Sequence, residues 1–266
     1  MSQARFSVQS AIFAGLAFWR VNVLKVAGPL VIAIAALAVI TTAGNAPIEL
    51  LAWIVYGLAG SVVAAACYRI ALVGLAPELE RQRGPLGLQF RGLELRLVAI
   101  GLMKIFLLIA PVILMAGATL DYVFARFSLA SAVAASPEGF FNVMSPAGQG
   151  AFIVTAMMTL GVLLVLDAAL ALAAPSTAVD GRLRFLSSFR RTRGSVLRIL
   201  FATLVVRAPL IALQSLATLY VDLADAPGAM HWIQLGIGVV STCFYLPISV
   251  GMMSYIYVRL REGEPE

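Results

Sequence analysis

The chain has 266 residues, of which 61% are hydrophobic and only 12% are charged. Soluble globular domains carry about 25% charged residues, so this composition excludes a water-soluble fold with a single buried core. The net charge is +6, and arginine supplies nearly all of the positive charge because Lys25 and Lys104 are the only lysines.

Six apolar segments are long enough to cross a bilayer, which requires about 20 residues per helix. No cleavage signature of small residues follows the first of them, so we expect it to stay in the membrane. The predicted fold is all-α and polytopic, a single membrane domain over residues 1–266. We expect the spans near residues 26–43, 50–75, 97–119, 151–174, 199–221 and 232–258.

An amphipathic segment precedes each pair of spans. Such segments lie along a membrane surface with their apolar face toward the lipid. In the second segment the stripe leaves Arg91 and Glu94 on another face. The three apolar stripes are Val8, Ile12, Leu16, Trp19 and Val23, then Leu86, Phe90, Leu93 and Leu97, and finally Phe185 and Phe189.

Two Ala-Pro pairs recur along the chain at the same offset. Ala76-Pro77 recurs as Ala174-Pro175, and Ala110-Pro111 recurs as Ala208-Pro209. The pattern favours three repeated units, near 1–75, 76–174 and 175–266, each with an amphipathic helix and a hairpin of spans. Chance recurrence in an alanine-rich chain is the alternative.

The connections between spans differ strongly in charge. One set contains most of the 19 lysines and arginines, whereas the other set contains only Arg126. An excess of lysine and arginine in short connections marks the cytoplasmic side, so we expect both termini to face the cytoplasm. The basic connections are those before the first span, between spans two and three, between spans four and five, and after span six.

The most basic connection includes the stretch FLSSFRRTRGSVLRIL, residues 185–200. Nucleic-acid binding requires a folded basic surface or interleaved aromatic residues, which a short connector between two spans does not provide. Anionic lipid headgroups are the nearer partner, at about 1 kcal/mol per basic residue close to the surface. The residues expected to contact headgroups are Arg182, Arg184, Arg190, Arg191, Arg193 and Arg198.

Residues 175–206 read PSTAVDGRLRFLSSFRRTRGSVLRILFATLVV, in which a proline ends a span and a Val-acidic-Gly turn follows. The stretch resembles the YciC-like family of uncharacterised bacterial six-span membrane proteins, which is related to the membrane domain of some glycerophosphodiester phosphodiesterases. The resemblance implies an inner-membrane protein without the catalytic domain that the fused members carry. Asp180 stands where the family often has glutamate, and Phe189 replaces its usual tryptophan. The matching residues are Pro175, Val179, Asp180, Gly181, Ser188, Arg193 and Gly194.

Four ionisable residues lie inside the predicted spans, namely Arg69, Lys104, Asp167 and Arg207. Such residues are costly in lipid, and counting residues places all four about 9 to 12 Å below the cytoplasmic interface. One interpretation is a pocket at this level for an anionic group such as a lipid phosphate. The other is a structural pair of Asp167 with Arg207 or Lys104, while Arg69 and Lys104 extend to the headgroups.

Small and cyclic residues inside the spans raise two further expectations. Pro111 and Pro209 favour simple kinks, although broken helices line the sites of some transporters. The glycines Gly57, Gly60, Gly236 and Gly238 allow close approach of helices.

Motifs of enzymes and metal sites are missing from the sequence. His231, the only histidine, lies beside Trp232 at the end of a span, where an interfacial anchor is expected. Cys67 and Cys243 lie in apolar runs without a metal-binding or redox pattern, so we expect no cofactor. The sequence favours a non-enzymatic scaffold or accessory component that engages anionic lipid or a larger membrane complex, with a transporter or channel at Arg69, Lys104, Asp167 and Arg207 as the alternative.

Overall fold

A computed structural model describes residues 6–42, 46–82, 84–127, 146–224 and 229–262. The described residues are almost entirely helical and contain no strand, which confirms the all-α class. Among the described residues, six stretches are long and apolar enough to cross a membrane, so the chain is a polytopic membrane protein as predicted. These stretches are Val8–Thr42, Ala46–Ala71, Gly92–Met115, Gln149–Asp180, Val196–Val221 and Ala229–Glu262.

The chain divides into two compact units, residues 1–100 with 169–266 and residues 101–168. This division does not follow the boundaries of the three expected repeats, and the duplication stays a prediction. The members of each Ala-Pro pair do lie in similar places: Ala76 and Ala174 follow short turns after long helices, whereas Pro111 and Pro209 lie inside helices.

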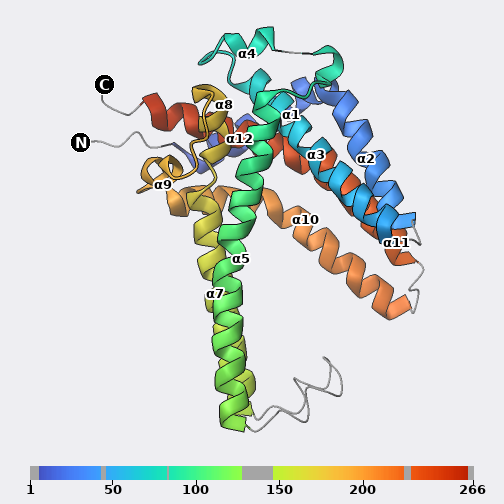
Figure 1. The fold of residues 1–266 in the computed structure, drawn as a ribbon, viewed down its shortest axis with the longest axis vertical. Helices are drawn as coiled ribbons and strands as arrows, with labels where there is room; N and C mark the ends of the chain where they lie inside the picture. Colours follow the sequence, from blue (N-terminus) through green and yellow to red (C-terminus); the bar gives the residue numbers. More distant parts are fainter. Residues whose placement is uncertain (1–5, 43–45, 83, 128–145, 225–228, 263–266) are drawn as a thin grey trace. The chain divides into compact units, whose positions relative to one another are not determined.

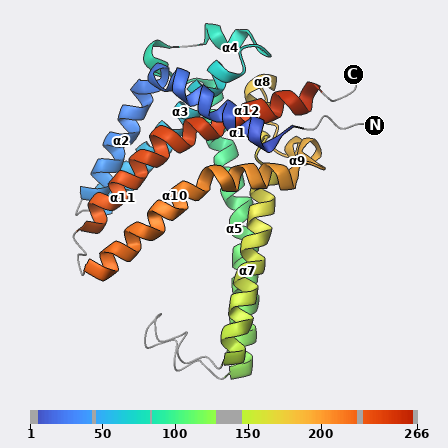
Figure 2. The ribbon, with the colours of Figure 1, turned by 180° about the vertical axis from the view of Figure 1, so that it is seen from behind.

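The first unit contains most of the helices. Their bounds are α1 (Val8–Asn22), the 3-10 turn η1 (Val23–Val26), α2 (Ala27–Thr42), α3 (Ala46–Ala71), α4 (Glu78–Arg81), the 3-10 turn η2 (Pro85–Gly87), the start of α5 (Gly92–Phe127), α8 (Ala173–Asp180), α9 (Ser187–Thr192), α10 (Val196–Ala224), α11 (Ala229–Val240), the π-helical turn η4 (Ser241–Tyr245) and α12 (Leu246–Glu262). Helices α2, α3 and α11 lie side by side, with α10 next to α11 (Figures 1 and 2). Helix α10 is bent and contains Pro209, as expected for a proline kink, whereas α5 continues through Pro111 as one helix.

Helix α1 packs antiparallel against α12, and small residues bring the two helices close together. A Cβ atom added at Gly15 would lie 2.6 Å from the Ile248 carbonyl oxygen, and one added at Gly251 would lie 2.6 Å from Cβ of Phe18. On α1 the fully buried residues are Ala11 and Gly15, whereas Leu16 of the predicted stripe is 41% exposed. The small residues of α1 therefore form its closest contact with α12, while the other members of the stripe are half-buried and Trp19 contacts η4.

The second predicted amphipathic segment is not a continuous helix. Leu86 has a φ of 52° in the turn η2, and α5 begins only at Gly92. Leu93 and Leu97 are buried, but Phe90 is 52% exposed in the extended segment before the helix. The left-handed conformation of Leu86 and Gly87 interrupts the helical period on which the expected stripe depends.

Of the four glycines expected at helix contacts, only Gly238 meets a neighbouring helix. A Cβ atom there would collide with the Leu37 side chain of α2. Gly57, Gly60 and Gly236 face open space in the described part of the chain. The contacts between α1 and α12 use Gly15 and Gly251, which the sequence did not single out.

The second unit is a hairpin of two long helices, the main part of α5 and α7 (Pro146–Ala169). The Thr159 hydroxyl lies 3.2 Å from the Met115 sulfur, and Lys104 contacts Asp167 further along the hairpin, so the two helices run antiparallel. Large apolar side chains on this hairpin face outward, with Phe106 73% and Leu114 72% exposed. Such exposure suits a surface surrounded by lipid.

Candidate functional site

Arg69 and Glu94 form an ion pair inside the first unit. The Arg69 Nη1 lies 2.5 Å from Oε1 of Glu94, and both side chains are 0% exposed. The other Glu94 oxygen accepts a hydrogen bond of 2.8 Å from the Arg91 backbone N–H. This second contact caps the first turn of α5. Nε and Nη2 of Arg69 are buried and have no acceptor among the described residues.

This pair corrects the expectation that Arg69 extends to the headgroups and that Glu94 turns away. Complete burial leaves Arg69 no route to the membrane surface. A buried guanidinium requires a carboxylate nearby. The one signal in the sequence was an arginine without an evident partner inside the preceding span, and this signal does not fix which acid faces Arg69.

Lys104 and Asp167 form an ion pair in the second unit. Nζ of Lys104 lies 2.5 Å from Oδ1 of Asp167, and the two side chains are 30% and 21% exposed. Of the two partners expected for Asp167, the structure pairs it with Lys104. The four in-span residues thus belong to two units, and their grouping at one level stays a prediction.

The π-helical turn η4 is contacted by residues of α1, α3 and α10, and Arg207 is the residue from α10. Nε of Arg207 donates to the Tyr245 hydroxyl, and the Tyr56 hydroxyl of α3 lies 3.1 Å from Oγ1 of Thr242. The Trp19 indole of α1 donates a 3.0 Å hydrogen bond to the Cys243 carbonyl. Pro247 lacks the N–H that would bond this carbonyl in a regular helix, so Trp19 supplies the missing donor.

A second broken helix lies in the connection 170–195. The N–H of Ala173 bonds to Leu170, which leaves the Ala169 carbonyl at the end of α7 without its helical donor. Ser188 and Thr192 of α9 supply it with hydroxyl hydrogen bonds of 2.8 and 3.1 Å, and both residues are fully buried. Gly181 ends α8 in the left-handed region at a φ of 61°, which suits glycine.

The structure therefore gives local roles to several residues of the stretch 175–194. Asp180 lies 3.2 Å from Nε of Arg184 and 4.0 Å from Nη1 of Arg191. Arg191 also donates a 3.0 Å hydrogen bond to the Tyr257 hydroxyl of α12. The hydroxyls of Ser188 and Thr192 hold the connection to the end of α7, and Arg191 holds it to α12.

The six arginines expected to contact headgroups separate into two groups. Arg184 and Arg191 take part in the ion pairs with Asp180. Arg182, Arg190 and Arg193 have exposed side chains, and Arg198 is half-buried. Apolar side chains alternate with the exposed arginines: Leu186 is 73% exposed and Leu197 is 75% exposed.

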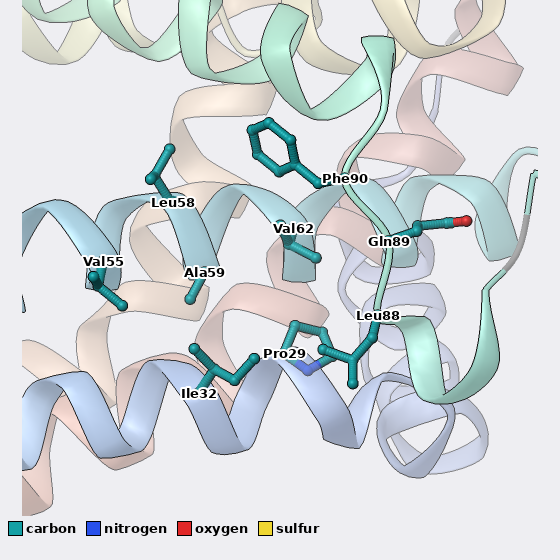
Figure 3. A pocket seen from close by; sticks show the side chains of 9 residues that line it. All are labelled: Pro29, Ile32, Val55, Leu58, Ala59, Val62, Leu88, Gln89 and Phe90. Atoms are coloured by element: carbon teal, nitrogen blue, oxygen red, sulfur yellow. The ribbon is translucent and has the colours of Figure 1, made fainter.

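An apolar groove of about 470 Å³ lies between α2 and α3. Figure 3 shows Ile32 of α2 facing Val55 and Ala59 of α3, with Phe90 above them. The Gln89 amide points away from these side chains (Figure 3), so the groove presents almost only hydrocarbon. Its shape and lining suit an acyl chain rather than a polar substrate.

No group of histidine, cysteine, aspartate and glutamate suitable for a metal ion occurs among the described residues. Comparison of the chain with family models, with curated proteins and with solved structures returns no match. The fold and its contacts therefore define the class of the protein, a polytopic helical membrane protein, and the function rests on the chemistry of its own residues.

Proposed function

We propose that this chain is a non-enzymatic, multi-pass protein of the bacterial inner membrane, a scaffold or accessory component that engages anionic lipid headgroups or a larger membrane complex. Both termini face the cytoplasm in this proposal. The likeness of residues 175–206 to the YciC-like family leads to the same location.

The observation that carries the proposal is the surface of the connection 181–198. It presents the exposed Arg182, Arg190 and Arg193 together with the exposed Leu186 and Leu197. On a surface of this kind, leucine side chains insert at the level of the acyl chains and guanidinium groups bind the lipid phosphates. Because the connection is fixed to α7 and α12, the arginines are held in place before a lipid arrives, which lowers the entropic cost of binding.

Two further features support lipid engagement over transport. Arg69, one residue of the alternative transport site, is fully buried and paired, as expected for a packed structural element. The groove between α2 and α3 has room for an acyl chain and is lined by apolar residues.

The test removes the three exposed arginines in the whole protein. The variant R182Q/R190Q/R193Q is reconstituted in vesicles of phosphatidylethanolamine and phosphatidylglycerol, and lipids retained after mild extraction are quantified by mass spectrometry. We expect the wild type to enrich phosphatidylglycerol and the variant to lose up to about 3 kcal/mol of this preference. Raising the salt concentration weakens the preference in the wild type, because exposed charges are screened.

The matched control is Arg184→Gln, which removes an arginine that Asp180 already engages. It should lose much less of the preference than the triple variant. Equal phosphatidylglycerol enrichment in the wild type and the triple variant at low salt would exclude this connection as a headgroup site.

A further inference from the structure

A second cavity of about 450 Å³ lies in the first unit among α2, α3, α10 and α11, next to the turn η4. It differs from the groove between α2 and α3 because polar side chains share its lining. These include the amides of Gln214 and Gln234 and the hydroxyls of Tyr56 and Ser241. None of the described residues that line it carries a charge.

Gln214 and Gln234 lie inside membrane-spanning segments that end at Val221 and begin at Ala229, respectively. At a rise of about 1.5 Å per residue, Gln214 lies about 10 Å and Gln234 about 8 Å inside its span. Both side chains are exposed, and neither amide has a hydrogen-bond partner among the described residues. An amide in hydrocarbon without a partner is costly, so these two side chains require a polar group that the described protein does not supply.

The Tyr56 hydroxyl, another polar group of the cavity, is already oriented. Tyr56 is fixed by its contact with Thr242 and by an edge-on contact with Trp53, whose ring centroid lies 6.0 Å away. The hydroxyl of Tyr56 can still take part in one more hydrogen bond, since a phenol both donates and accepts. The cavity therefore combines donors and acceptors with apolar walls, and its volume is in the range of small-molecule sites.

We propose that this cavity binds an uncharged molecule that carries hydroxyl groups, held by the amides of Gln214 and Gln234. An amide donates from its NH2 and accepts at its oxygen, which matches hydroxyl groups, and no described lining residue supplies a counter-charge for a phosphate or ammonium group. A neutral lipid such as a diacylglycerol and a small free polyol share this chemistry. The site uses none of the arginines of the connection 181–198, so it is independent of the proposed headgroup binding.

The test uses a diacylglycerol with a photoreactive diazirine on one acyl chain, incorporated with the intact protein into nanodiscs. We expect the label to map to peptides of α3, α10 or α11, and a phosphatidic acid with the same acyl chains to label them far less. The double variant Q214L/Q234L should lower labelling by diacylglycerol about tenfold, since each lost hydrogen bond weakens binding several-fold. Gln9→Leu, the same change on α1 outside the cavity, should leave it unchanged.

If the double variant folds poorly, competition between the probe and unlabelled lipids for the wild-type protein still tests the proposal. Unlabelled dioleoylglycerol should displace the probe, whereas dioleoylphosphatidate should not; displacement by excess glycerol as well assigns the site to free polyols. Labelling that is equal in the double variant and the wild type overturns the proposal, as does displacement by phosphatidate. So does a dimer that dissociates in the double variant, because a second copy of the chain then fills the cavity.

Discussion

The two long connections of the first unit, residues 72–91 and 170–195, are both anchored by buried polar contacts, but the chemistry of these contacts differs. Each follows a long helix that ends in a short turn before an Ala-Pro pair. The first is anchored by a fully buried ion pair between Arg69 and Glu94. The second is anchored by the neutral hydroxyls of Ser188 and Thr192 on the Ala169 carbonyl.

The two kinds of contact differ in how much stability is lost when one side chain is removed. A buried ion pair gives little net stability, but loss of one partner leaves a charge that has no solvent. Hydroxyl groups on a carbonyl can be removed one at a time, because the remaining donor still satisfies the acceptor. Removing one side chain should therefore destabilise the first connection strongly, whereas it should destabilise the second only weakly.

The largest expected effect comes from breaking the ion pair on one side. Arg69→Met or Glu94→Leu alone should lower the free energy of unfolding by about 3 to 5 kcal/mol, because each leaves an uncompensated buried charge. The double variant R69M/E94L should recover most of the loss. Thermal unfolding in detergent, followed by circular dichroism, measures all three, with the exposed Glu80→Gln as the control.

A double variant as unstable as the single variants would contradict this explanation. It would mean that the capping contact of Glu94 with the Arg91 N–H, which the double variant also removes, contributes more than the charge pair.

A smaller effect is expected from the hydroxyl groups. The double variant S188A/T192V leaves the Ala169 carbonyl without either donor and should cost about 2 kcal/mol, whereas each single change should cost less than half of that. Ser187→Ala is the matched control, since its hydroxyl bonds to Arg184 at an exposed position. The same unfolding measurement applies, and strictly additive single effects would show that the two hydroxyls do not share the acceptor.

The smallest effect is expected at Asp180. Asp180→Asn removes the ion pairs with Arg184 and Arg191, which are partly exposed. The change should cost less than about 1 kcal/mol. The loss should shrink as salt is added, unlike the loss at Glu94. Unfolding midpoints at low and high salt separate the two, and a salt-independent loss at Asp180 would rule out an electrostatic role.

The sequence predicted the six spans well because hydropathy is a local property. Their centres follow from runs of apolar residues, and the structure moves only their ends. The connection between the predicted spans 97–119 and 151–174 is shortened by α5, which continues to Phe127, and by α7, which begins at Pro146; residues 128–145 lie outside the described part of the chain.

The partners of polar residues could not be predicted in the same way. Whether Arg69 faces Glu94 or the headgroups depends on how α5 starts, and the turn at Leu86 and Gly87 sets that start. Gln214 and Gln234 read as ordinary span residues until α10 and α11 are brought to one cavity. Both cases depend on contacts between distant segments, which periodicity along one helix does not contain.

The packing of α1 on α12 makes the order of synthesis matter. Gly15 fits against a helix that is synthesised much later, so α1 lacks this neighbour while the helices between the two are made. During that interval we expect the apolar side chains of α1 to lie on the lipid surface, and the contact with α12 forms only after α12 has been inserted. The contact between α1 and α12 is therefore a late step of assembly, and we expect a larger side chain at Gly251 to slow this step, because it would collide with Phe18.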